Sequence, residues 1–195
     1  MIPTLFFLAY SFKVIGIDCA GCAPPIVKAL RAVPGVTSAK VDTKSGLVTV
    51  EIPDGFDKSK LRAAVVNAGF ETEESFKALP PEVAKKLDIA PYDGKSLAAG
   101  KITVVDYYAD WCGPCHVLEA RLQRYMVAHP NVAVRRADIG KWDTRFAREA
   151  TKFGAEALPY IRVYDARGKF VAAVTGSMWD EVLAALEKAA VRNAE

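Results

Sequence analysis

Hydrophobic positions in residues 10–77 switch between the two-residue period of strands and the helical period of three to four residues. Two apolar runs are separated by Asp42-Thr43-Lys44-Ser45-Gly46, a sequence typical of a hairpin turn. In chain order the pattern predicts a strand over 12–17, a helix over 26–33, strands over 36–41 and 47–52, a helix over 61–68 and a short strand over 70–75. This order predicts a ferredoxin-like βαββαβ domain over residues 10–77.

The pattern changes at Lys101, after which a nearly continuous apolar run over 102–108 is typical of a strand buried on both faces. The elements predicted to follow are a helix ending near 129, a strand over 132–139, a helix over 144–153, strands over 160–164 and 170–174, and a helix over 179–191. Alternating strands and helices that end in a hairpin predict a mixed sheet covered by helices over residues 96–195. Residues 78–95 hold three prolines and a glycine, which predict a linker or an irregular cap with a short polar helix. The chain is therefore predicted to be an α/β (α+β) protein of two domains.

Composition and charge narrow the class of protein. Of the 195 residues, 51% are apolar and 25% are charged, so a folded globular chain is expected rather than a disordered one. The net charge of +3 is spread evenly, with nine basic and eight acidic residues in 1–80 and seventeen and fifteen in 81–195. Neither part is basic enough to track a phosphate backbone, which argues against nucleic acid as a partner. No run of eighteen apolar residues occurs, so no transmembrane segment is predicted.

The stretch from Ile2 to Tyr10 is apolar apart from Thr4. No Lys or Arg precedes it, and it is shorter than a full signal peptide. Two interpretations stay open, the end of a signal sequence or an extended first strand of the small domain. The apolar start favours a periplasmic or cell-envelope location over a cytoplasmic one.

The four cysteines form two pairs of the same spacing, Cys19-Ala20-Gly21-Cys22 and Cys112-Gly113-Pro114-Cys115. A C-x-x-C pair closes almost no loop, so it constrains the unfolded chain too little to act as a structural staple. A zinc ribbon would place its two pairs about 15–20 residues apart, whereas 89 residues separate these. Two separate dithiol sites are therefore predicted.

The second pair lies between a predicted strand and a predicted helix, which would place Cys112 at a helix N-terminus. The helix dipole and the unpaired amides of that position stabilise a thiolate. Cys112 is therefore predicted to attack, and the less exposed Cys115 to resolve the mixed disulfide. Asp106 stands six residues earlier in the apolar strand, where burial would raise the pKa of its carboxyl and suit proton exchange with the resolving thiol. The alternative is that Asp106 caps the edge of the strand.

The stretch Asp106-Tyr107-Tyr108-Ala109-Asp110-Trp111-Cys112-Gly113-Pro114-Cys115 resembles the active site of the thioredoxin family, and the resemblance extends over residues 96–195. It implies a thioredoxin fold and thiol-disulfide oxidoreductase activity, with Trp111, Gly113 and Pro114 as parts of the motif. Pro159, in Ala157-Leu158-Pro159-Tyr160, matches the family's cis-proline facing the dithiol, and Gly176 matches a glycine near the substrate groove. The implied partners are protein disulfides and a thiol electron donor, and no organic cofactor is implied.

Three residues depart from the family pattern. Ala120 occupies the place of a kinking proline, His116 follows the dithiol directly, and Tyr160 stands where thioredoxins prefer threonine. These departures leave dithiol chemistry intact but leave the class of protein substrate open.

The first pair suits a soft metal ion. Two thiolates on a loop fit Cu(I) or Hg(II) better than Zn(II), which takes four ligands in structural sites. The stretch Gly16-Ile17-Asp18-Cys19-Ala20-Gly21-Cys22 resembles the heavy-metal-associated domain of metallochaperones and metal-pumping ATPases, and the resemblance covers residues 10–77. It implies Cys19 and Cys22 as metal ligands, and a metal-transporting or metal-accepting protein as a partner. The alternative is an idle, reduced pair on an inherited fold.

The two pairs together lead to the hypothesis of a thiol-disulfide oxidoreductase coupled to a soft-metal domain in heavy-metal handling. Because only thiolates bind metal, the second domain would reduce the metal site of a partner, or of its own first domain, before loading. One competing hypothesis is a metal carrier whose thioredoxin-like domain serves for docking. Another is a metal-free redox relay between Cys19–Cys22 and the second pair. The direction of the redox chemistry is not predicted.

Overall fold

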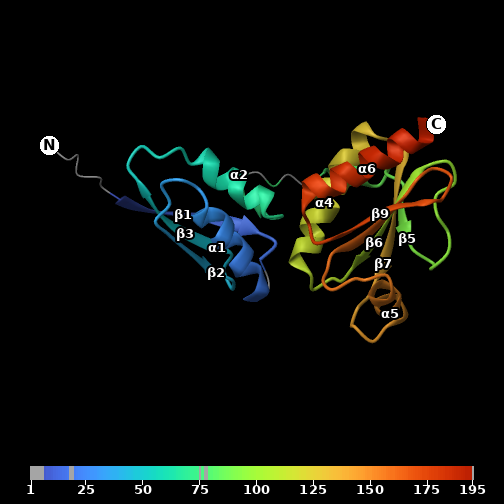
Figure 1. Cartoon of the computed structure of the whole chain (residues 1–195), viewed down its shortest axis with the longest axis horizontal. Coiled ribbons are helices and arrows are strands. Elements are labelled where there is room, and N and C mark those ends of the chain that lie inside the picture. Colours follow the sequence, from blue (N-terminus) through green and yellow to red (C-terminus); the bar gives the residue numbers. More distant parts are fainter. Residues whose placement is uncertain (1–6, 18–19, 75, 77–78, 195) are drawn as a thin grey trace. The chain divides into compact units, whose positions relative to one another are not determined.

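The computed structural model describes residues 7–17, 20–74, 76 and 79–194, in two compact units that divide after Phe76 (Figure 1). The elements of the first unit are β1 (Phe7–Ile15), the short 3-10 helix η1 (Ala20–Cys22), α1 (Ala23–Arg31), β2 (Ser38–Asp42), β3 (Leu47–Pro53), α2 (Ser59–Asn67) and β4 (Glu71–Thr72). The strands form one antiparallel sheet in the order β2-β3-β1-β4. This arrangement confirms the predicted ferredoxin-like fold.

The first strand is longer than its hydrophobic pattern predicts, and the last is shorter. β1 starts at Phe7, which pairs with Pro53 of β3, so residues 7–10 form strand as one of the two interpretations predicted. Residues 1–6 lie outside the described residues. β4 pairs with β1 only at Val14 and Ile15, because a turn follows at once, closed by the amide of Phe76 on the carbonyl of Thr72.

The core of the first unit lies between the sheet and helices α1 and α2. Alternate residues of β1 and β3 face the helices, as expected for an antiparallel sheet with one covered face. The buried members are Val14, Val48, Val50 and Ile52 of the strands, Ile26 and Leu30 of α1, and Leu61 and Val65 of α2. The β2–β3 turn is held by Asp42, whose carboxylate accepts from the amide of Lys44 at 3.0 Å and the hydroxyl of Ser45 at 2.7 Å. These contacts confirm the hairpin predicted from the sequence.

The second unit is a mixed five-stranded sheet covered by helices. Its elements are α3 (Pro81–Ala84), β5 (Ile89–Pro91), β6 (Ile102–Tyr108), α4 (Gly113–Ala128), β7 (Val132–Asp138), α5 (Arg145–Lys152), β8 (Tyr160–Tyr164), β9 (Phe170–Thr175) and α6 (Trp179–Ala194). The strand order is β5-β7-β6-β8-β9, with the first three parallel and the last two antiparallel to their neighbours. This confirms the predicted mixed sheet.

One strand of this sheet lies in residues 78–95, for which the sequence predicts a linker. β5 pairs with β7 over Ile89–Pro91, so these residues belong to the second unit. The strand has only three residues and ends in proline, which leaves no periodic signal in the sequence. Residues 92–101 then join β5 to β6 without a helix. Tyr92 and Leu97 of this loop pack against the buried cluster on the α5 side of the sheet.

Strand β6 runs through the middle of the sheet and is buried on both faces. Ile102 and Val104 pack in the cluster that α4 and α6 cover, whereas Val105 and Tyr107 pack in the cluster that α5 covers. The Tyr107 hydroxyl donates to a carboxylate oxygen of Glu149 on α5 at 2.5 Å. A polar side chain in this strand is therefore removed from water, a condition that governs the chemistry of Asp106.

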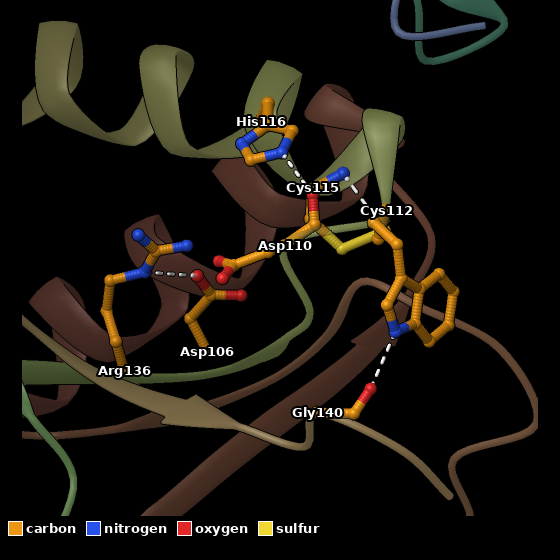
Figure 2. The surroundings of a disulfide bond; sticks show 8 residues. Asp106, Asp110, Cys112, Cys115, His116, Arg136 and Gly140 are labelled. Atoms are coloured by element: carbon orange, nitrogen blue, oxygen red, sulfur yellow. Dashed lines mark hydrogen bonds and ion pairs between the residues drawn. A yellow bond between two sulfur atoms is a disulfide. The ribbon is translucent and has the colours of Figure 1, made fainter. Parts of the chain in front are cut away.

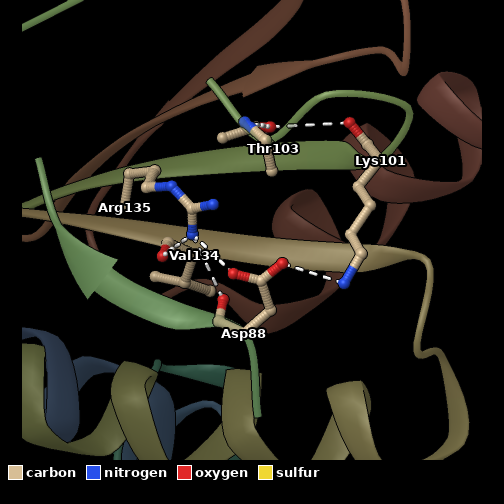
Figure 3. A network of polar contacts seen from close by, with 6 residues as sticks. Asp88, Lys101, Thr103, Val134 and Arg135 are labelled. Carbon is tan, nitrogen blue, oxygen red and sulfur yellow. Dashed lines mark hydrogen bonds and ion pairs between the residues drawn. The ribbon is translucent and has the colours of Figure 1, made fainter. Parts of the chain in front are cut away.

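An ionic network joins the residue before β5 to the residue before β6 and to β7 (Figure 3). Asp88 lies 2.8 Å from Nζ of Lys101 and 2.9 Å from a guanidinium nitrogen of Arg135. The hydrogen bond from Lys101, followed by that from Arg135, lowers the pKa of Asp88. The ionised carboxylate therefore adds stability above its unfolded pKa, and that stability is lost as the pH falls towards its folded pKa.

We expect Asp88→Asn to reduce the free energy of unfolding by about 1–2 kcal/mol at pH 7, because it leaves the half-buried Arg135 without its carboxylate. The difference from the parent chain should shrink as the pH falls below 3.8, because the unfolded parent chain then protonates Asp88 whereas the folded chain does so only at lower pH. Urea unfolding followed by tryptophan fluorescence measures the effect, because Trp111, Trp142 and Trp179 all lie in this unit. Asp143→Asn, at an exposed carboxylate, is the control. Equal losses at pH 7 and pH 3 would contradict the ionic explanation.

Candidate functional site

The second cysteine pair is a disulfide at the N-terminus of α4 (Figure 2). Cys112 is the N-cap residue, and its sulfur accepts the amide hydrogen of Cys115 at 3.3 Å. Both residues are buried, with Cys112 at 5% exposure and Cys115 at 1%. On reduction, the same amide and the positive end of the helix dipole favour a thiolate on Cys112. Cys112 thus lies at the predicted helix N-terminus, and Cys115 is the less exposed of the two.

Two hydrogen bonds fix the turn that leads into the disulfide (Figure 2). The indole nitrogen of Trp111 donates to the carbonyl of Gly140 at 2.6 Å, which ties this turn to the loop after β7. Nε2 of His116 lies 2.9 Å from the carbonyl of Asp110 and donates to it, because a carbonyl oxygen can only accept. Trp111 remains 55% exposed, and Trp142, in the loop that Trp111 contacts, is 46% exposed. No motif in the sequence marks Trp142.

Asp106 lies inside the sheet rather than at its edge. Its neighbours are Arg136 on β7 and Ile161 on β8, so the alternative of a carboxylate capping the strand edge is wrong. The side chain is 2% exposed, and one oxygen lies 3.4 Å from Nε of Arg136 (Figure 2). Burial raises the pKa of Asp106 from 3.8 to about 6, against the opposing charge of Arg136 and with a further rise from Glu119. A buried carboxyl of this kind accepts and returns a proton near neutral pH.

Residues around Pro159 pack beside the disulfide. The Leu158–Pro159 peptide bond is cis, as the resemblance implied. Leu158 and Tyr160, which flank Pro159, belong to the same buried cluster as the two cysteines. The amide of Gly176 donates to the carbonyl of Pro159 at 2.7 Å, which brings the predicted glycine to this place. Tyr160 is 2% exposed and its hydroxyl donates to the carbonyl of Phe153, so its side chain belongs to the core.

The rest of the motif shapes the start of α4. Gly113 is the first residue of the helix and Pro114 the second, where a missing amide hydrogen costs little. Ala120, in the place of a kinking proline, lies within one continuous helix from Gly113 to Ala128. The second C-x-x-C pair therefore lies at the start of a continuous helix rather than within a loop.

The first cysteine pair is only partly within the described residues. Cys22 ends η1 and is 3% exposed, among the core residues of the first unit that include Ile26 and Phe70. Cys19 lies outside the described residues. A buried thiol among apolar side chains is a donor that fits a soft ion. Within the described ranges, no group of three or more His, Cys, Asp or Glu side chains gathers to hold a metal ion.

The thioredoxin family profile matches residues 84–188, which is more than half of the chain. The chain belongs to the thioredoxin family. The heavy-metal-associated domain profile matches residues 11–71. The protein is therefore a heavy-metal-associated domain fused to a thioredoxin domain, as the two resemblances implied.

Known proteins resemble each domain separately. The chloroplastic thioredoxin F of Oryza sativa subsp. japonica is 31% identical over 90 residues, which are 46% of this chain and 46% of that protein. The copper-transporting ATPase 1 of Rhizobium meliloti (strain 1021) is 38% identical over 64 residues, which are 33% of this chain and 8% of the ATPase. The long form of spinach chloroplast thioredoxin F, a solved structure, is 22% identical with a TM-score of 0.44, over 58% of this chain and 98% of that one. The chain thus spans about half the length of the curated thioredoxins it matches.

The thioredoxin domain implies thiol-disulfide oxidoreductase chemistry at the level of the family. The heavy-metal-associated domain adds a module of metal-binding type. Among the helices that the structure describes, none has the length and hydropathy of a membrane span.

Proposed function

We propose that the chain exchanges thiols and disulfides with partner proteins at Cys112 and Cys115. The observation that carries this proposal is the disulfide at the start of α4, where the Cys112 sulfur accepts an amide hydrogen bond and a buried carboxyl lies in the adjacent strand. A disulfide held for structure alone would need neither the amide contact nor the costly burial of Asp106.

The reaction runs in two exchanges that together move two electrons to the substrate. The Cys112 thiolate attacks one sulfur of a substrate disulfide, the substrate S–S bond breaks, and the first substrate thiolate leaves and is protonated. Cys115 then gives its thiol proton to Asp106, and its thiolate attacks the Cys112 sulfur. The second substrate thiolate leaves and takes up a proton, and the Cys112–Cys115 disulfide remains. A dithiol electron donor reduces this disulfide for the next cycle.

The same chemistry prepares a thiolate pair for a soft metal. An oxidised C-x-x-C pair cannot bind metal, because only thiolates are ligands. The match to a heavy-metal-associated domain and the likeness to a copper-transporting ATPase support Cu(I), with Hg(II) as the alternative, as cargo held by Cys19 and Cys22. In this proposal the thioredoxin domain keeps that pair, or the pair of a metal-accepting partner, reduced.

The coupling predicts that Cys112→Ser slows metal loading of oxidised protein. With a dithiol reductant that acts through thioredoxin domains, the parent chain should recover Cu(I) binding at least about tenfold faster than the variant, because the variant lacks the attacking sulfur. Cu(I) bound per chain is measured over time with a competing chromophoric chelator. Cys22→Ser, which removes a ligand, is the control for metal bound elsewhere. Equal loading of the parent and Cys112→Ser chains would refute the coupling.

A second candidate is a metal carrier whose thioredoxin domain serves for docking. The exposed Trp111 and Trp142 favour it, because large exposed apolar side chains are typical of contact surfaces. Reduction of insulin disulfides separates the two functions, since a pure carrier would show none.

A further inference from the structure

Arg136 stands at the centre of a cluster that the sequence did not reveal. A terminal guanidinium nitrogen lies 2.9 Å from Glu119 of α4, and Nε lies 3.4 Å from Asp106 of β6. The guanidinium carbon also lies 3.5 Å from the ring centre of Tyr108. All of these side chains are largely shielded, with Asp106 at 2%, Arg136 at 18% and Glu119 at 27% exposure. The single guanidinium of Arg136 therefore pairs with the carboxylates of both Asp106 and Glu119 in a region of low dielectric constant.

The two carboxylates do not share this cation equally. The Glu119 contact has the length of a charge-assisted hydrogen bond. The Asp106 contact is longer, and within the described residues neither Nε of Arg136 nor Oδ1 of Asp106 has a hydrogen-bond partner. Buried polar atoms normally have a hydrogen-bond partner, so the lack of one at these two atoms needs an explanation. Glu119 holds one terminal nitrogen of this guanidinium, and the other, Nη2, has no hydrogen-bond partner within the described residues.

We propose that Glu119 is a positioning residue, which holds Arg136 back from Asp106 so that the Asp106 carboxyl stays available to exchange a proton with Cys115. This assignment rests on the proposed dithiol exchange, in which Asp106 takes the Cys115 proton. With a full bidentate pairing to Arg136, Asp106 would be a weak base, because a strong ion pair stabilises the ionised form. Glu119 prevents that pairing and adds a like charge of its own.

The other groups around Asp106 do not replace this effect. The neighbour on β8 is Ile161, which carries no charge, and the neighbour on β7 is Arg136 itself. The start of α4 contributes the disulfide, and the helix itself contributes Glu119 and His116. The His116 ring is hydrogen-bonded to the Asp110 carbonyl. The carboxylates of Asp110 and Asp138 act on the pKa of Tyr108. For the pKa of Asp106, the acting charges are Arg136, which lowers it, and Glu119, which raises it.

The test is Glu119→Gln, which keeps the shape of the side chain and removes its charge. Carboxyl-carbon NMR of the oxidised full chain should show the Asp106 pKa lower by about one pH unit, because Arg136 turns to Asp106 and a like charge is lost. In insulin reduction, the pH at which the rate falls on the acid side of its pH profile should decrease by the same amount. From an Asp106 pKa of about 6, the reactive ionised fraction at pH 5 then rises about fivefold.

Matched variants separate charge from structure. Glu119→Asp keeps the charge and should restore most of the parent profile, whereas Glu187→Gln, at an exposed carboxylate of α6, should leave it unchanged. An Asp106 titration in Glu119→Gln identical to that of the parent chain would overturn the assignment. The NMR titration does not require catalysis, so it decides the role of Glu119 even if the parent chain fails to reduce insulin. That second failure would count against the proposed function alone.

Discussion

Cys112→Ser is expected to lower the rate of insulin reduction by at least about a thousandfold, because a serine hydroxyl does not ionise near neutral pH and cannot attack a disulfide. The amide of Cys115 and the dipole of α4 would still be present, but without a sulfur to receive their stabilisation. Turbidity of precipitating insulin B chain, with a dithiol reductant present, measures the rate.

Cys115→Ser is the matched variant for this experiment. It keeps the attacking sulfur but cannot resolve the mixed disulfide, so a covalent adduct with the substrate should accumulate. Mass spectrometry after quenching with acid detects that adduct. An adduct formed by Cys112→Ser through Cys115 would reverse the assigned roles. Unchanged insulin reduction by Cys112→Ser would remove the basis of the proposed function.

Asp106→Asn is expected to stabilise the oxidised chain by about 3 kcal/mol at pH 8. The folded pKa of Asp106 is raised from 3.8 to about 6 by burial, so the folded state binds the proton more tightly than the unfolded state does. Stability of the parent chain therefore falls as the pH rises from 3.8 to 6 and then stays constant. An asparagine carries no charge at any pH and avoids this loss.

The measurement is urea unfolding at pH 4 and pH 8, followed by tryptophan fluorescence with the disulfide intact. The gain should be present at pH 8 and nearly absent at pH 4, where the parent carboxyl is already protonated in the folded state. The same variant should reduce insulin more slowly, by roughly a hundredfold, because Cys115 loses its proton acceptor. A destabilised variant at pH 8 would show that the charged carboxylate is held favourably, contrary to the geometry of its contacts.

Much of the fold was predictable because hydrophobic spacing is a local signal. The strands and helices that carry both C-x-x-C pairs follow directly from it, and so does the burial of Asp106 inside an apolar run. β5 was missed because three residues show no period. β1 was predicted too short, because a mostly apolar start resembles a targeting segment as much as a strand.

The partners of Asp106 were not predictable in the same way. Arg136 faces Asp106 because of the parallel register of β6 and β7, although thirty positions separate the two residues in the sequence. Glu119 lies one turn beyond Cys115 on α4, where a charged residue is typical of a solvated helix face. A search for a cation on the strand next to a buried acid would have found Arg136. No local pattern marks Glu119.

Cys22 and Cys112 each stand directly before a helix, and the two helices differ in the amides that their first turns offer to sulfur. α4 begins Gly-Pro-Cys, so an amide proton from its third residue reaches Cys112, whereas α1 begins Ala-Pro-Pro, and its second and third residues have no amide proton. The second and third residues of α1 therefore cannot donate to sulfur as the amide of Cys115 does in α4. The same spacing of two cysteines thus meets a different backbone in each domain, and this difference is written in the two residues between or after the thiols.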